Sequence, residues 1–396
     1  MKIKAVRTKL YEWTGPTEAP SQKLSNNPLD IFETSSEAGG NTLKSFAFHN
    51  WLIVEVETDN GIVGIGNAAL SPQVTRAVID HHLRAIVVGE DPWDIERLWQ
   101  LMYRKTIAFG RKGAVLAAIS AIDIAVWDIL GQAAGQPVYR LIGGATRDAI
   151  PVYASKIYNQ PLDALIAEAA DYKRQNFQGV KMRLGYGPRD GAAGMAKNIA
   201  NIRAVRETIG DEVDLMVEVY MGWTFNYARQ ILPRLAEFNL RWVEEPLLPD
   251  EIEGYAELNR LGHVPIAGGE HEHTLAGFRT LVEKRAVDYL QFDTNRVGGI
   301  TAARKIATLA EAFGVEFVPH AGQMHNYQVV MSSYAAPMAE FFPPCPIEVG
   351  NELFWYIFDG EPLAENGTIR LDPNKPGMGL NLSEKHLHNF RITEGG

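Results

Sequence analysis

Six acidic or imidazole side chains recur at intervals of 20 to 27 residues in the second half of this 396-residue chain. They are Glu218, Glu244, Glu270, Asp293, His320 and Glu340. An interval of this length holds one strand, one helix and their connections, so each residue is expected to end a successive strand of a repeated βα pattern. In a closed parallel barrel the carboxyl ends of all strands open on one face. We therefore expect these side chains to meet in one site.

Three of these carboxylates, Glu218, Glu244 and Glu270, follow three successive strands. Oxygen ligands of this kind suit a hard divalent cation, and Mg²⁺ is the first candidate. The alternative is that each acidic residue caps the helix that follows its strand. That alternative explains any one carboxylate more readily than all three in register, so the sequence favours a metal site.

His320 lies one strand after Asp293 in the predicted order. A carboxylate beside an imidazole orients the ring and raises its basicity, which together make a general base and its orienting partner. A lone histidine after Val-Pro is more often structural than catalytic. The position of Asp293 reverses that preference, and we expect an acid–base dyad.

The strands that would carry these residues are short apolar runs, which alternate with amphipathic helical stretches beyond residue 150. The pattern is typical of βα units around a parallel sheet. The runs centre on residues 151–153, 180–182, 215–217, 241–243, 264–266, 289–292, 315–318 and 339–341. Eight strands suffice for a closed barrel. We predict an α/β fold with a (β/α)8 TIM-type barrel over residues 136–350.

The first 135 residues have a different pattern. Alternating strands are expected over residues 2–13 and 51–66, and helices over 73–88, 92–106 and 114–134. We predict an α+β capping domain over residues 1–135, with a mobile lid loop at about residues 15–50. The turn-rich segment 351–396 is expected to return to this domain.

Composition narrows the classes of function. The chain has 38 Lys and Arg against 48 Asp and Glu, a formal charge of −10, which is the wrong sign for a nucleic-acid partner. The single Cys345 cannot form an intramolecular disulfide, and no signal-peptide pattern opens the sequence. The most apolar stretch, residues 114–130, carries two aspartates and is expected to be a buried helix rather than a membrane span. We expect a cytoplasmic protein without a membrane partner.

Several motifs resemble the enolase superfamily, and within it the acid-sugar dehydratases of the mandelate racemase subgroup. The motifs are Asp123-Ile124-Ala125-Val126-Trp127-Asp128, Pro137-Val138-Tyr139-Arg140-Leu141-Ile142-Gly143-Gly144, Trp242-Val243-Glu244-Glu245-Pro246, Gly269-Glu270, and Asp293 with Val297-Gly298-Gly299-Ile300-Thr301. The resemblance covers nearly the whole chain. It implies a modified TIM-type barrel under a capping domain, often in a homo-oligomer.

The same resemblance implies residue roles. Glu218, Glu244 and Glu270 would bind Mg²⁺, and His320 with Asp293 would be the acid–base dyad. Glu340 would hydrogen-bond the substrate carboxylate. At Glu218 the chain departs from many relatives, which carry Asp there.

A second departure lies on the second barrel strand, where racemases of the subgroup carry Lys-x-Lys and this chain has Lys181-Met182-Arg183. Arginine stays protonated at neutral pH, so Arg183 is a poor base and a good electrostatic clamp. The pair Lys181 and Arg183 would help to stabilise an enediolate. This departure favours dehydration driven by His320 over two-base racemisation.

The loop Tyr186-Gly187-Pro188-Arg189-Asp190-Gly191 and the Gly269-Glu270-His271 sequence resemble the L-rhamnonate dehydratase group. The resemblance implies loss of the C2 proton and the C3 hydroxyl from an aldonate, giving a 2-keto-3-deoxy acid. His271 would protonate the leaving hydroxyl or contact the substrate, or it has a packing role. A racemase or epimerase of a 2-hydroxy acid, and a non-catalytic sugar-acid binder, are the alternatives.

Three further residues are candidate substrate contacts. Lys44 and His49 belong to the expected lid, and Tyr220 follows the third barrel strand. Each also has an ordinary role available, as a solvated surface residue or as a packing residue.

Overall fold

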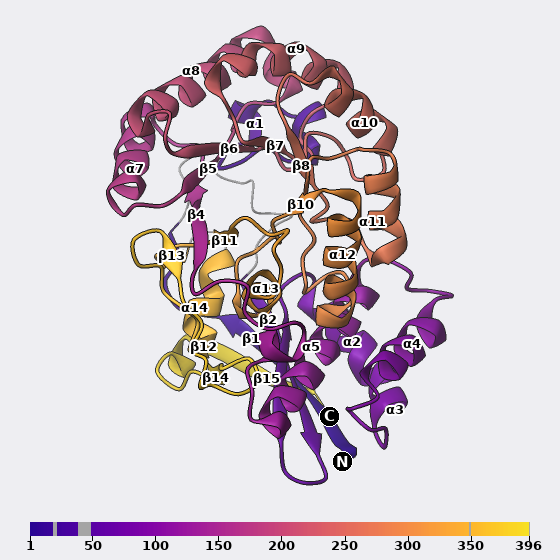
Figure 1. The fold of residues 1–396 in the computed structure, drawn as a ribbon. Coiled ribbons are helices and arrows are strands. Elements are labelled where there is room, and N and C mark those ends of the chain that lie inside the picture. Colours follow the sequence, from indigo (N-terminus) through magenta and orange to yellow (C-terminus); the bar gives the residue numbers. More distant parts are fainter. Residues whose placement is uncertain (19–21, 39–48, 348–349, 396) are drawn as a thin grey trace.

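The computed structural model describes residues 1–18, 22–38, 49–347 and 350–395. Its larger part is a curled sheet of eight parallel strands, hydrogen-bonded in the order β10-β9-β8-β7-β6-β5-β4-β11 (Figure 1). The strands are β4 (Ile150–Ile157), β5 (Gly179–Arg183), β6 (Asp214–Glu218), β7 (Trp242–Glu244), β8 (Ile266–Gly268), β9 (Tyr289–Leu290), β10 (Glu316–Phe317) and β11 (Ala339–Phe341). Each strand lies in one of the eight predicted apolar runs or overlaps it.

Helices follow the strands and cover the outside of the sheet (Figure 1). They are α7 (Leu162–Arg174), α8 (Gly191–Ile209), α9 (Phe225–Leu235), α10 (Ile252–Leu261), α11 (Thr274–Glu283), α12 (Gly299–Phe313) and α13 (Met324–Met331). The parallel strands and their outer helices confirm the predicted modified TIM-type barrel.

The N-terminal part is built on an antiparallel sheet in the order β15-β1-β2-β3. Its strands are β1 (Ile3–Trp13), β2 (Asn50–Thr58), β3 (Val63–Ala68) and β15 (Phe390–Gly395), and its helices are α2 (Pro72–Val78), α3 (Arg84–Val87), α4 (Ile95–Thr106) and α5 (Ala114–Ala134). A π-helical turn joins α2 to α3, so the predicted helix over 73–88 is one irregular element. Short elements complete the fold: α1 (Ser35–Ala38), α6 (Val138–Leu141), α14 (Phe354–Ile357), β12 (Phe358–Asp359), β13 (Thr368–Ile369) and β14 (Asn381–Leu382).

Helix α5 is the centre of the N-terminal part. By length and composition it is apolar enough to cross a membrane, but 94% of its most apolar window is buried inside the structure. It packs very closely on β3, because a Cβ added at Gly64 or Gly66 would lie 2.0 Å from Ala125 O or 1.8 Å from Ala121 O, respectively. These two glycines therefore permit a close helix–sheet contact.

The C-terminal segment contacts both parts of the molecule. Strand β13 pairs with β4 of the barrel, and β15 pairs with β1 of the antiparallel sheet. The division of the chain at residues 135 and 350 stays a prediction.

Part of the expected lid packs on the barrel. The backbone N–H of Asn26 donates to Leu184 O at 2.6 Å, directly after β5. Lys23 and Asp30 form a buried ion pair, and the Ser35 hydroxyl donates to Asp190 at 2.8 Å. Residues 22–38 thus lie against the carboxyl ends of the strands, whereas Lys44 is outside the described residues.

Candidate active site

The predicted carboxylate trio meets at the ends of three neighbouring strands. Glu218 and Glu244 are the last residues of β6 and β7 and pair in register, and Glu270 comes two residues after β8. One carboxylate oxygen from each residue lies within 4.8 Å of those from the other two. All three side chains are buried. The strand spacing in the sequence therefore predicted a real cluster.

This cluster suits a divalent cation by the chemistry of its donors. It offers only oxygen atoms, which Mg²⁺ prefers, and three closely spaced buried carboxylates need positive charge. Glu244 is further held through Oε2, which accepts hydrogen bonds from Trp242 Nε1 at 2.9 Å and Gln291 Nε2 at 2.6 Å. Sequence reasoning missed both donors.

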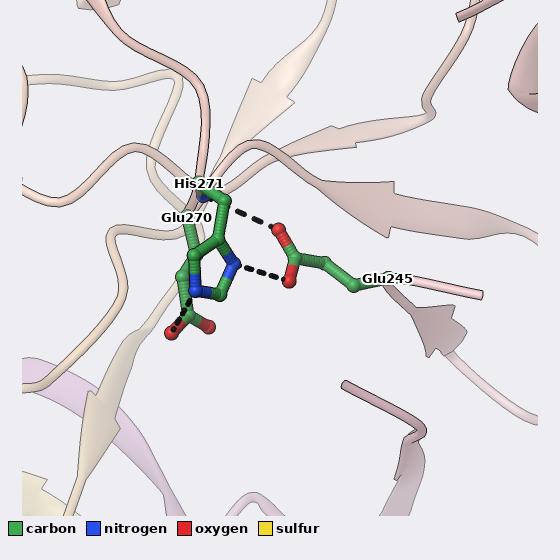
Figure 2. A group of neighbouring side chains, drawn as sticks. All are labelled: Glu245, Glu270 and His271. Carbon is green, nitrogen blue, oxygen red and sulfur yellow. Dashed lines mark hydrogen bonds and ion pairs between the residues drawn. The ribbon is translucent and has the colours of Figure 1, made fainter. Parts of the chain in front are cut away.

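A second group of possible ligands shares Glu270 and adds Glu245 and His271, again within 4.8 Å (Figure 2). It includes an imidazole nitrogen, a ligand more typical of Zn²⁺ and other transition metals. The all-oxygen trio is therefore the better magnesium site.

Lys181 lies among the carboxylates. Its Nζ is 3.1 Å from Glu218, 2.5 Å from Glu244 and 2.8 Å from Glu340. Burial disfavours the charged ammonium, but Glu244 and Glu340 outweigh burial and raise the pKa of Lys181 well above its usual value. Burial and the neighbouring Glu218 raise the pKa of Glu244. Lys181 therefore supplies a fixed positive charge to the cluster.

The carboxylate of Glu340 lies beside the same cluster, in contact with Lys181. Its Oε2 accepts a hydrogen bond from the backbone N–H of Ala321 at 2.8 Å. Burial acts to raise its pKa, but Lys181 and His320 outweigh burial and lower the pKa to about 2. The group is therefore ionised at neutral pH.

The predicted dyad is also formed. His320 Nδ1 is 2.9 Å from Asp293 Oδ2, and His320 Nε2 is 3.2 Å from Glu270 Oε1. One ring nitrogen thus contacts the orienting carboxylate while the other faces the trio. The side-chain amide of Asn326 donates to His320 O at 2.5 Å and so holds the backbone of this residue.

Arg296, which is not among the residues predicted from the sequence, links the dyad to the trio. Its Nε lies 3.0 Å from Asp293 Oδ2 and its Nη1 lies 2.9 Å from Glu270 Oε1. Burial acts to raise the pKa of Asp293, but Arg296 and His320 hold it below its usual value. For Glu270, the neighbouring His320 and then Arg296 outweigh burial and lower the pKa. The only signal in the sequence is the spacing of three residues between Asp293 and Arg296.

His271 lies at the edge of the trio, in contact with Glu245. Its Nδ1 is 2.7 Å from Glu245 Oε2, and its Nε2 is 3.8 Å from Glu270 Oε1 (Figure 2). Burial acts to lower the pKa of His271, but Glu245 and then Glu270 raise it. The ring of Tyr220 meets the imidazole edge to face, with centroids 5.2 Å apart. Both predicted residues are therefore at the site, and Glu245 is an additional partner.

Arg183 lies on β5 two residues beyond Lys181, with its guanidinium 4.7 Å from the centroid of the Tyr158 ring. It is buried, and within the described part of the chain its Nη1 has no hydrogen-bond partner. This nitrogen can donate to an anionic group of a bound substrate.

A small hollow lies beside the dyad, between the barrel and the antiparallel sheet. Its lining includes His320, Arg296 and Phe342 from the barrel and Trp51 and Leu70 from the N-terminal part. The backbone oxygen of the neighbouring lid residue His49 accepts a hydrogen bond from Trp13 N at 2.8 Å. The role of His49 in substrate binding stays a prediction.

Comparison with known proteins agrees with this geometry. The model of the family described as "Enolase C-terminal domain-like" matches residues 164–386, which is more than half of the chain. The model described as "Mandelate racemase / muconate lactonizing enzyme, N-terminal domain" matches residues 42–143. The chain belongs to the enolase superfamily.

Relatives in this superfamily include a curated L-rhamnonate dehydratase from Saccharopolyspora erythraea, which is 38% identical over 84% of this chain and 83% of its own length. The crystal structure of L-rhamnonate dehydratase from Gibberella zeae is similar with a TM-score of 0.85 and 31% identity, covering 98% of this chain and 95% of that one. A Gibberella zeae rhamnonate dehydratase structure complexed with Mg has a TM-score of 0.83 and 29% identity, covering 98% of this chain and 96% of that one.

Proposed function

We propose that this enzyme is a Mg²⁺-dependent hydro-lyase that dehydrates an aldonate such as L-rhamnonate to the 2-keto-3-deoxy acid. The observation that carries the proposal is the contact between an all-carboxylate trio and a histidine–aspartate dyad, through His320 Nε2 and Glu270 at 3.2 Å. A base held beside a cation site suits abstraction of a proton next to a carboxylate.

The trio of Glu218, Glu244 and Glu270 would hold the ion. When bound there, Mg²⁺ supplies positive charge that offsets the charge developing on the substrate carboxylate. Lys181 and Arg183 add positive charge on the β5 side, where Arg183 has a donor to offer.

His320 then removes the proton from C2 of the substrate, while Asp293 holds the opposite ring nitrogen. The electron pair left on C2 expels the C3 hydroxyl, which takes a proton from His320 or His271 and leaves as water. The enol that remains gains a proton at C3 and becomes the 2-keto-3-deoxy acid. The step needs no oxidant, because one water leaves and the redox state is unchanged overall.

Glu340 fits this scheme in a specific way. As an ionised group bonded to Lys181 it fixes the ammonium beside the trio. To hydrogen-bond the substrate carboxylate, Glu340 has to take up a proton when the substrate binds. We propose both roles, the second only in the complex.

A second candidate activity is epimerisation of a 2-hydroxy acid. The observation that favours it is that two histidines lie near the same carboxylate oxygen. His320 Nε2 is 3.2 Å and His271 Nε2 is 3.8 Å from Glu270 Oε1. Arg183 argues against the two-base version that uses the second strand.

The test is a panel of aldonic and aldaric acids incubated with the enzyme and Mg²⁺, in which 2-keto acids are detected as semicarbazones. Turnover of L-rhamnonate or of a stereochemical neighbour, lost in His320→Asn, supports the proposal. If no 2-keto acid forms from any acid in the panel and an epimer of one of them accumulates instead, the proposal is contradicted.

We further propose a cytoplasmic homo-oligomer without nucleic-acid or membrane partners. The formal charge of −10 argues against a nucleic-acid partner, and the single cysteine suits a cytoplasmic protein. The homo-oligomer is what the resemblance to the enolase superfamily implies. Native mass spectrometry tests the oligomeric state, and a mass equal to one chain contradicts it.

A further inference from the structure

The N-terminus of α12 is capped by side chains from another part of the molecule. Ser120 Oγ, on α5, accepts hydrogen bonds from the backbone N–H groups of Gly298 at 2.8 Å and Gly299 at 3.0 Å. Asp123 Oδ1, one turn further along α5, accepts from Thr301 N at 3.0 Å. The first N–H groups of a helix have no partner within the helix, so α5 supplies the missing acceptors.

The two helices fit closely at this point. Gly298 and Gly299 have positive φ angles of 111° and 79°. A Cβ at Gly299 would lie 2.2 Å from Asp123 Oδ1, and one at Gly298 would lie 2.8 Å from Trp99 Nε1. The Trp99 indole also donates to Gly298 O at 2.7 Å. The turn is therefore held from both sides by the N-terminal part.

The same turn begins with a residue of the dyad. Asp293 O accepts backbone hydrogen bonds from Arg296 at 2.8 Å and Val297 at 3.0 Å, and Thr294 O accepts from Gly299 at 3.1 Å. The turn from residue 293 to 299 is thus a compact hydrogen-bonded unit. It carries the Asp293 carboxylate and the Arg296 guanidinium at one end and the contacts to α5 at the other.

We infer that Ser120 and Asp123 are positioning residues, through which α5 sets the place of Asp293 and Arg296 relative to His320 and Glu270. The inference rests on the proposed function, because it assigns a role in the proton transfer by His320. The side chains of Ser120 and Asp123 act on this step only through the turn 293–299 and the first turn of α12, where Asp123 holds Thr301 N.

Asp128 offers a matched control on the same helix. Like Asp123 it is a buried aspartate that accepts backbone hydrogen bonds, here from Met378 at 2.8 Å and Ile65 at 3.0 Å. Those partners belong to the C-terminal segment and to β3, away from the turn 293–299. Loss of Asp128 therefore removes similar interactions without touching the turn.

The experiment compares Asp123→Ala, Asp123→Asn, Ser120→Ala and Asp128→Ala with the wild-type enzyme. For each we measure kcat and KM at saturating Mg²⁺, the melting temperature, and amide hydrogen exchange of residues 294–301. Misplacement of reacting groups by about 1 Å costs up to about 10²-fold in rate, so we expect kcat to fall by about 10- to 100-fold in Asp123→Ala and Ser120→Ala. KM should change by less than about twofold, since neither residue touches the substrate.

The other variants separate positioning from folding. Asp123→Asn keeps an Oδ1 acceptor and should restore most of kcat. Asp128→Ala should lower the melting temperature as Asp123→Ala does but leave kcat unchanged. Faster exchange at 298, 299 and 301 is expected in Asp123→Ala and Ser120→Ala alone.

Equal loss of kcat in Asp128→Ala and Asp123→Ala would overturn the inference, as would wild-type exchange of residues 294–301 in the Ser120→Ala variant. If Asp123→Ala does not fold, Ser120→Ala and Asp123→Asn decide the question. A wild-type enzyme that turns over no sugar acid contradicts the proposed function instead. In that case hydrogen exchange still measures whether the contact with α5 holds residues 294–301. Failure of the inference can therefore be distinguished from failure of the proposed function.

Discussion

Gln291 gives the proposed metal site its most specific test, because it contacts Glu244, one of the three proposed ligands, without being a ligand itself. Its Nε2 donates to Glu244 Oε2 at 2.6 Å, next to the bond from Trp242 Nε1 at 2.9 Å. Both donors point to the same oxygen and so fix the carboxylate plane. Gln291→Leu removes one donor and keeps a side chain of similar size in a fully buried position.

The expected magnitude follows from the loss of this one bond. A hydrogen bond to a charged group contributes about 1.5 to 3 kcal/mol. Loss of a partner behind a metal ligand weakens metal affinity by about 10- to 100-fold, which corresponds to about 1.4 to 2.7 kcal/mol. We therefore expect the half-saturating Mg²⁺ concentration to rise by about 10- to 100-fold, while kcat at saturating Mg²⁺ changes by less than about threefold.

The assay is the initial rate as a function of Mg²⁺ concentration, with calorimetry of Mg²⁺ binding in parallel. Gln328→Leu is the control, because Gln328 is also buried and its Oε1 accepts from Tyr139 N at 2.7 Å, away from the trio. An unchanged Mg²⁺ requirement in Gln291→Leu, or an equal change in Gln328→Leu, would show that the hydrogen bond from Gln291 to Glu244 does not support Mg²⁺ binding.

Three further predictions concern charge, pH and packing. Arg296→Leu leaves Glu270 and Asp293 without their shared cation, so we expect kcat/KM to fall by more than about 10²-fold in steady-state kinetics; near-normal kinetics would contradict this. Burial raises the pKa of Asp128 from 3.8 to about 6, so its protonated form stabilises the fold at low pH and that contribution is lost as pH rises through about 6. Urea unfolding of Asp128→Asn should therefore depend less on pH between about 4 and 6 than that of the wild type, and an equal slope in the two proteins would exclude the raised pKa of Asp128. Gly66→Ala places a Cβ 1.8 Å from Ala121 O, so we expect the free energy of unfolding measured by urea titration to fall by about 3 kcal/mol or more. An unchanged free energy of unfolding would mean that this close contact is absent.

The sequence predicted the strands and the residues at their ends well, because both depend on local pattern. The two-residue β9 and β10 lie within the predicted runs, and Asp293 and His320 follow them as expected. The trio could be inferred for the same reason, since parallel strands of equal spacing bring their ends to one face.

Contacts between side chains could not be read from the sequence. Gln291, directly after β9, and Arg296, in the turn that follows, both reach the trio, and only the curvature of the sheet makes them its neighbours. Glu245 follows Glu244 directly, so simple strand alternation would point it away from the site. Its positive φ of 42° breaks that alternation, and its carboxylate instead reaches His271.

The central claim is that His320 removes the C2 proton of a sugar acid and that the C3 hydroxyl then leaves. Proton NMR of the Mg²⁺-loaded enzyme with L-rhamnonate in deuterated water tests it most directly. For the wild-type enzyme we predict a 2-keto-3-deoxy product with one deuterium at C3 and no C2 epimer of the remaining substrate. With His320→Asn we predict no 2-keto-3-deoxy product. Accumulation of the C2 epimer without keto acid, or an undiminished rate in His320→Asn, would contradict the account.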